Sequence, residues 1–124
     1  MDKDKKIVLI VEDDQAQSKA LHDKLSEKYN VALARNGEEC MSVIGVSEPD
    51  LIMLDIFMPY KGGLEVLEEL KKDEKLKGIP IIILTNYNDE EKISKAMVNG
   101  VTEYLVKSNY SMDDIVNKVN EKLS

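Results

Sequence analysis

Residues 7–14 read Ile-Val-Leu-Ile-Val-Glu-Asp-Asp, a short apolar run that ends directly in three acids. Such a run of consecutive apolar residues, mostly β-branched, is typical of a strand that is buried on both faces of a parallel sheet. The acids would then lie at the carboxyl end of that strand, where open α/β sheets place their ligand sites. The stretch therefore predicts a fold class and also the edge of the sheet at which to look for chemistry.

The same alternation of apolar runs with helical patterns continues along the chain. Further strands are predicted at residues 31–34, 51–54, 81–84 and 102–106, and further helices at 38–44, from 62–63, at 88–98 and from 111. Asp14 is expected to cap the first helix, with Gln17 at its third position and Ala20, Leu21 and Leu25 facing inward. This order predicts a single α/β domain over residues 1–124, with a doubly wound, five-stranded parallel sheet and five helices.

Composition narrows the classes of function. The 124 residues carry 17 Lys and Arg against 24 Asp and Glu, and this net charge of −7 disfavours direct binding of nucleic acid. The apolar runs are far shorter than the roughly 18 residues of a membrane-spanning helix, and no signal peptide is recognisable. The single Cys40 excludes an internal disulfide, and the single His22 excludes metal sites built on two histidines. A small cytoplasmic domain without membrane contact is predicted, with oxygen ligands for any metal.

Chemically active side chains follow four of the predicted strands. Glu12 and Asp13 follow the first strand, Asp55 the third, Thr85 the fourth and Lys107 the fifth. If the sheet order is 2-1-3-4-5, the three carboxylates converge at a topological switch point. Two carboxylates about 6 Å apart repel by roughly 3 kcal/mol at an effective dielectric near 20, and a hard divalent cation such as Mg²⁺ removes that cost. An aspartate beside Mg²⁺, a lysine and a hydroxyl is arranged to attack phosphorus.

Four motifs carry a resemblance to a known family. They are Val-Glu-Asp-Asp at 11–14, Leu-Asp-Ile-Phe-Met-Pro at 54–59, Leu-Thr at 84–85 and Tyr-Leu-Val-Lys at 104–107. In this order and spacing they resemble the receiver domain of two-component response regulators, and the resemblance covers essentially the whole chain. It implies a flavodoxin-like receiver fold.

The resemblance also implies a phosphoryl-accepting metal site. Asp55 would be the phosphoacceptor, and Asp13 would ligate Mg²⁺ directly while Glu12 would do so mostly through water. Phe57 would contribute its backbone carbonyl to the metal, and Lys107 would pair with the Asp55 carboxylate or with its phosphoryl group.

A switch pair and a set of residues that influence phosphoryl lifetime follow from the same resemblance. Thr85 and Tyr104 would be the switch pair, in which the hydroxyl moves to the phosphoryl group and the ring follows inward. Bulky Phe57 and Tyr87 would shield the phosphoryl group from water and slow its loss. Asn86 departs from the family, which usually has a small residue there, and would narrow access to the pocket.

One further departure concerns the loop after the fifth strand. Ser108 follows Lys107 where the family often has a proline preceded by a cis peptide bond. A cis bond before a residue other than proline costs about 2.5–4 kcal/mol. A cis bond before Ser108 would therefore be costly, which puts the geometry of this loop in doubt.

The leading functional hypothesis is a stand-alone, chemotaxis-regulator-like signalling switch. A sensor histidine kinase, a phosphotransfer protein or a small acyl phosphate would donate the phosphoryl group. A downstream partner would then read the face built from the fourth strand, the fourth helix, the fifth strand and the fifth helix. The alternative is a docking scaffold that acts without phosphorylation. A turnover phosphatase of the haloacid-dehalogenase type is disfavoured, because Phe57 stands where those enzymes have a general-acid aspartate. A flavodoxin-like FMN protein is also disfavoured, because acids at 12–14 would repel the FMN phosphate.

Overall fold

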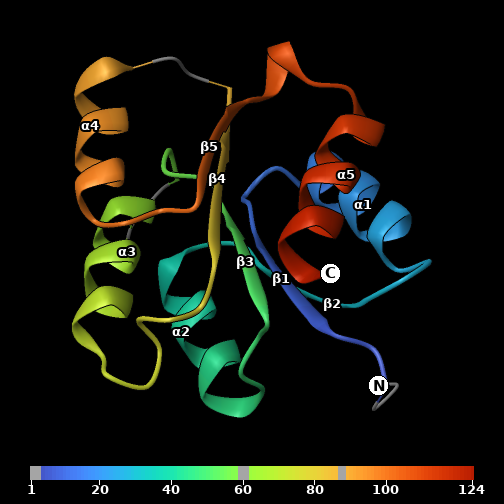
Figure 1. The fold of residues 1–124 in the computed structure, drawn as a ribbon, viewed down its shortest axis with the longest axis horizontal. Coiled ribbons are helices and arrows are strands. Elements are labelled where there is room, and N and C mark those ends of the chain that lie inside the picture. Colours follow the sequence, from blue (N-terminus) through green and yellow to red (C-terminus); the bar gives the residue numbers. More distant parts are fainter. Residues whose placement is uncertain (1–3, 59–61, 87–88) are drawn as a thin grey trace.

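Five parallel strands form one sheet in the order β2-β1-β3-β4-β5, as predicted (Figure 1). This computed structural model describes residues 4–58, 62–86 and 89–124. The strands are β1 (Ile7–Val11), β2 (Asn30–Ala34), β3 (Leu51–Leu54), β4 (Ile81–Thr85) and β5 (Glu103–Val106). The reversal of strand order between β1 and β3 creates the switch point at which a site was expected.

Helices cover both faces of this sheet. They are α1 (Gln15–Leu25), α2 (Gly37–Val46), α3 (Gly63–Lys72), α4 (Glu90–Val98) and α5 (Met112–Leu123), and a short 3-10 turn, η1 (Lys107–Asn109), precedes the last helix. Figure 1 shows α2, α3 and α4 on one side of the sheet and α1 and α5 on the other. The predicted doubly wound α/β architecture is therefore confirmed for the described residues.

The core lies in two layers, one on each face of the sheet. Successive strand residues point to opposite faces, so Leu9 packs with Ile52 toward α3 while Ile10 packs with Met53 toward α1 and α5. Every residue of β3 and β4 is buried, which explains their continuous apolar sequences. The rigid sheet therefore fixes where the residues at its carboxyl edge are placed.

Helix α1 differs from its predicted phase at one position. Ala20 is exposed, whereas Ser18, Leu21 and Leu25 are buried. Those three residues lie at i, i+3 and i+7 on one helical face, and Ala20 lies about a quarter turn away from Leu21. The prediction for Ala20 was therefore wrong, because the small buried residue of this face is a serine.

Side-chain caps fix the N-termini of α1, α2, α4 and α5. Asp14, Asn36, Asp89 and Ser111 each accept a backbone N–H at the start of a helix, and Ser111 forms a complete capping box with Asp114. Of the helices in the described ranges, none combines the length and apolarity that a bilayer crossing requires.

Candidate functional site

Three carboxylates meet at the carboxyl edge of β1 and β3. The register places Val11 opposite Leu54, and the backbone N–H of Asp55 donates to the Val11 carbonyl at 3.0 Å. One carboxylate oxygen from each of Glu12, Asp13 and Asp55 lies within 4.8 Å of the others. Glu12 and Asp55 are buried and Asp13 is exposed, so the cluster opens to solvent on one side. The convergence expected from the strand ends is therefore present.

The cluster has the electrostatics of a cation site. Loss of water raises the pKa of Asp13 above its ordinary value, and the hydrogen bond and charge of Glu12 raise it further. A raised pKa means that a third negative charge is unfavourable here unless a positive charge compensates it. Carboxylate oxygens are the ligands that hard divalent cations prefer, so these side chains fit such an ion.

Lys107 brings a positive charge to the cluster from the end of β5. Its Nζ donates to Oε1 of Glu12 and to Oε1 of Gln17, and its side chain is only 15% exposed. The prediction paired Lys107 with the Asp55 carboxylate or its phosphoryl group, but in this structure the ammonium contacts Glu12 and Gln17 instead. Buried Glu12 needs a counter-charge, and Lys107 supplies it.

Gln17 contributes a contact to this site that sequence reasoning missed. It was expected only as a helix-capping residue, yet its side-chain oxygen accepts a hydrogen bond from Lys107. No sequence signal pointed to it, because the contact depends on the conformations of two long side chains from distant parts of the chain.

The backbone that follows β3 orients the Asp55 carboxylate. The N–H of Phe57 donates to Asp55 Oδ1 at 3.0 Å, while the half-buried Phe57 ring lies 5.4 Å from the Nζ of Lys92 on α4. Gly63, the first residue of α3, packs against the same backbone, and a Cβ built there would lie 2.5 Å from the Asp55 carbonyl oxygen. The Asp55 side chain is therefore oriented by the Phe57 N–H, and the backbone of residues 55–56 packs against the start of α3.

The two residues of the expected switch pair lie on neighbouring strands. Thr85 is fully buried at the end of β4, and the half-buried Tyr104 pairs with Ile83 in the β4–β5 ladder. Burial raises the pKa of Tyr104, and the negative charges of Asp89 and Asp55 raise it further. Tyr104 thus lies within the electric field of the acidic cluster, and its role as a switch stays a prediction.

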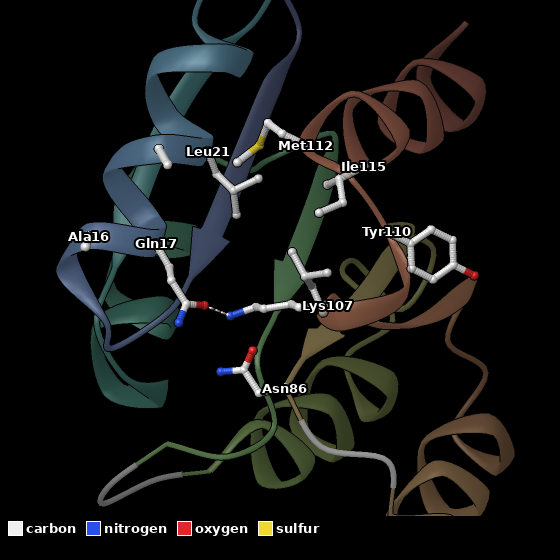
Figure 2. Close-up of a pocket in the computed structure, with 10 residues that line it drawn as sticks. Ala16, Gln17, Leu21, Asn86, Lys107, Tyr110, Met112 and Ile115 are labelled. Atoms are coloured by element: carbon white, nitrogen blue, oxygen red, sulfur yellow. Dashed lines mark hydrogen bonds between the residues drawn. The ribbon is translucent and has the colours of Figure 1, made fainter.

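A pocket of about 400 Å³ lies between α1 and the segment from β5 to α5. Figure 2 shows the Gln17 and Lys107 side chains meeting at its polar end, with Asn86 beside them. Asn86 is exposed. It lines this pocket, and its expected effect on access to the phosphoryl group stays a prediction. Tyr87, the other residue expected to influence phosphoryl lifetime, lies outside the described residues.

The loop after Lys107 is a 3-10 turn. It spans Lys107–Asn109, and all peptide bonds in the described parts of the chain are trans. Ser108 is therefore accommodated here without the cis bond that the family's proline often follows.

Comparison with known proteins identifies the family. A model of the response regulator receiver domain matches residues 8–120. The chemotaxis protein CheY of Halobacterium salinarum is 36% identical over 103 residues, which cover 82% of this chain and 84% of that protein. Some other curated relatives are much longer. The chain spans 7% of a hybrid signal transduction histidine kinase of Dictyostelium discoideum and 45% of a C4-dicarboxylate response regulator of Bacillus subtilis.

Two solved structures illustrate the states in which similar domains have been observed. The Mn²⁺-bound response regulator Rcp1 superposes with a TM-score of 0.81 at 30% identity, covering 94% of this chain and 90% of that chain. The phosphorylated cyanobacterial phytochrome response regulator RcpA gives a TM-score of 0.83 at 31% identity, with the same coverage.

The geometry of the site and the comparisons with known proteins indicate the same family. The acidic cluster fits a divalent metal, and the similar protein Rcp1 has been solved with Mn²⁺ bound. A phosphoryl-accepting switch is consistent with the phosphorylated structure of the similar protein RcpA. Receiver domains are signalling modules that interact with histidine kinases or phosphotransfer proteins, and some relatives of this chain are hybrid kinases. The chain belongs to the response regulator receiver domain family of two-component signalling.

Proposed function

We propose that Asp55 is the residue at which this receiver domain accepts a phosphoryl group. The donor is the phosphohistidine of a sensor histidine kinase or phosphotransfer protein, or a small acyl phosphate. The observation that carries the proposal is the cluster of Glu12, Asp13 and Asp55 oxygens within 4.8 Å, with the Lys107 ammonium bound to one of them. A structural role alone does not require three carboxylates at one sheet edge, because their repulsion opposes folding.

The chemistry is a direct displacement at phosphorus. A carboxylate oxygen of Asp55 forms a bond to phosphorus, and the bond from phosphorus to the donor breaks, with its electron pair leaving on the donor nitrogen or oxygen. The Phe57 N–H, 3.0 Å from Asp55 Oδ1, holds the carboxylate in a fixed orientation. Lys107 and the Thr85 hydroxyl are placed in the proposal as donors to the transferred oxygens.

We assign Mg²⁺ as the metal of this site. Glu12, Asp13 and Asp55 would hold it, with the backbone carbonyl of Phe57 as a further ligand. When bound, the ion supplies positive charge that offsets the charge on the transferring phosphoryl group. This assignment is supported by the all-oxygen ligand set, which suits a hard cation.

The output surface is proposed at α4, β5 and α5. Thr85 on β4 and Tyr104 on β5 would link this surface to the site by the switch movement described above. Strand β5 lies at the edge of the sheet. Met97 and Val98 at the end of α4 are 52% and 86% exposed, which favours a protein partner on this part of the molecule. Residues 1–124 would form one receiver domain that acts in the cytoplasm. This domain would transmit a signal and would not turn over a substrate.

Phosphorylation of the purified protein tests the assignment. The wild type is incubated with acetyl phosphate and Mg²⁺, and its intact mass is expected to increase by one phosphoryl group. Asp55→Asn should show no increase, while the control Asp113→Asn, which changes an exposed acid of α5 in the same way, should behave as the wild type.

Two results would overturn the proposal. An equal adduct on Asp55→Asn would place the acceptor elsewhere. A folded wild type that forms no adduct would instead favour the alternative function, a docking scaffold that acts without phosphorylation.

A further inference from the structure

We propose that Gln17 is a positioning residue that holds the Lys107 ammonium on the α1 side of the site and thereby restrains uptake of the phosphoryl group. The inference rests on the proposed roles of Asp55 and Lys107. It goes beyond them because it assigns control of the lysine to a residue outside the carboxylate cluster.

The contact joins two distant parts of the chain. Lys107 Nζ donates to Gln17 Oε1, and the two residues are separated by 90 positions. Figure 2 shows the two side chains extended toward each other between α1 and the end of β5. Because the Lys107 side chain is only 15% exposed, its ammonium depends on protein acceptors and not chiefly on water.

The amide of Gln17 is itself oriented by Asp14. Gln17 Nε2 donates to Asp14 Oδ2 at 3.4 Å, and the Gln17 backbone N–H donates to Asp14 Oδ1 at 3.0 Å. With the NH₂ group turned toward that carboxylate, Oε1 is the atom presented to Lys107. The result is a continuous chain of contacts from Asp14 through Gln17 and Lys107 to Glu12.

This chain has a consequence for phosphorylation. One named acceptor of the ammonium is Glu12, a member of the carboxylate cluster, and the other is Gln17, which lies outside the cluster on α1. A divalent cation at the carboxylate cluster would compete with Lys107 for Glu12, which leaves Gln17 as the acceptor that still holds the lysine. Movement of Lys107 to a phosphoryl group on Asp55 then requires loss of the Gln17 contact, so Gln17 favours the unphosphorylated form.

A purely structural role for Gln17 can be separated from this one. The helix cap uses the backbone N–H of residue 17, which every substitution except proline retains. Gln17→Met keeps an unbranched side chain of similar length and removes the strong acceptor. Gln17→Glu keeps the length and replaces the neutral acceptor with a carboxylate that binds the ammonium more strongly.

The experiment measures binding of beryllofluoride, a phosphoryl analogue, in the presence of saturating Mg²⁺. Gln17→Met should bind the analogue about threefold to tenfold more tightly than the wild type, as loss of one competing hydrogen bond of typical net strength predicts. Gln17→Glu should bind it more weakly by a similar factor. Gln15→Met and Gln15→Glu are matched controls on an exposed residue of the same helical turn, and both should bind as the wild type does.

A spectroscopic readout follows Lys107 directly. In protein with ¹⁵N-labelled lysine side chains, the Lys107 ammonium signal of the analogue-free state should shift in both Gln17 variants and stay in place in the Gln15 controls. Mg²⁺ affinity is measured separately for each variant, so that a change in metal binding is not mistaken for a change in the lysine.

The outcomes distinguish this inference from the function on which it rests. If the wild type and all variants bind the analogue equally, or if both Gln17 variants bind it more weakly, Gln17 does not restrain Lys107, although Asp55 remains the acceptor. If the wild type fails to bind the analogue at all, the proposed function itself fails.

Discussion

At position 63, a side chain of a single carbon would collide with the backbone that carries Asp55. A Cβ there would lie 2.5 Å from the Asp55 carbonyl oxygen and 2.6 Å from the Ile56 Cα, and backbone atoms cannot move aside as a flexible side chain can. We predict that Gly63→Ala destabilises the fold by about 1–3 kcal/mol, the usual cost of forced backbone shifts. Urea unfolding measures this directly.

Gly45 provides the control for that substitution. It lies in helix α2 with open space around its Cα, so Gly45→Ala should stabilise the protein by up to about 1 kcal/mol through helix propensity alone. If Gly63→Ala has the same stabilising effect as Gly45→Ala, the close packing of α3 on the Asp55 loop is not important for stability.

The limits of sequence reasoning are clearest for single contacts. The meeting of Glu12, Asp13 and Asp55 could be predicted, because a parallel sheet brings the ends of neighbouring strands together whatever their side chains are. The Lys107–Gln17 contact could not, because it depends on the conformations of two long side chains that are 90 positions apart.

At the scale of elements, hydrophobic pattern predicted the existence and order of every strand and α-helix described, but not the 3-10 turn η1. It failed in finer detail where the deciding information lies on another element. Thr85 was expected to follow its strand, yet it is the last residue of β4 because it pairs with Val106 on β5. The exposure of Ala20 depends likewise on how α1 is rotated against the sheet.

Helix α5 is tied to the rest of the fold by a buried tyrosine. Tyr29, just before β2, donates its hydroxyl to Asn120 Oδ1 at 2.5 Å, and burial raises the pKa of Tyr29 above 10.0. Because the folded state favours the neutral phenol, the contribution of Tyr29 is complete below the unfolded pKa near 10 and is lost as pH rises through the folded value.

We therefore predict two effects of Tyr29→Phe. At neutral pH it should lower the free energy of unfolding by about 1 kcal/mol, since Asn120 loses its hydrogen-bond donor. Above pH 10 the variant should lose less stability than the wild type does. Denaturant unfolding at neutral pH and above pH 10 gives the comparison, with Tyr110→Phe as a control on a tyrosine that is only partly buried. Parallel pH profiles for wild type and Tyr29→Phe would contradict the assignment.

At the scale of the whole molecule, acidic residues exceed basic ones by 24 to 17, and several ion pairs between described residues join exposed side chains. Such pairs contribute little to stability and are screened by salt. The acidic cluster differs because two of its carboxylates are buried, which makes it the place where a bound cation affects the stability of the entire fold.

We predict that Mg²⁺ raises the thermal midpoint of the wild type, and that this gain is absent in Asp13→Asn. A ligand that binds only the folded state adds about 2.7 kcal/mol at a hundred times its Kd. Without divalent metal, Asp13→Asn should be at least as stable as the wild type, because it removes a carboxylate whose charged form is disfavoured by loss of water and by the neighbouring Glu12, the causes that raise the Asp13 pKa. Calorimetry with MgCl₂, and with NaCl at the same ionic strength, separates binding from screening. Asp113→Asn, an exposed acid outside the cluster, should retain the full response. If NaCl reproduces the gain, or if Asp13→Asn keeps it, the cation acts on the surface charge and not at the cluster.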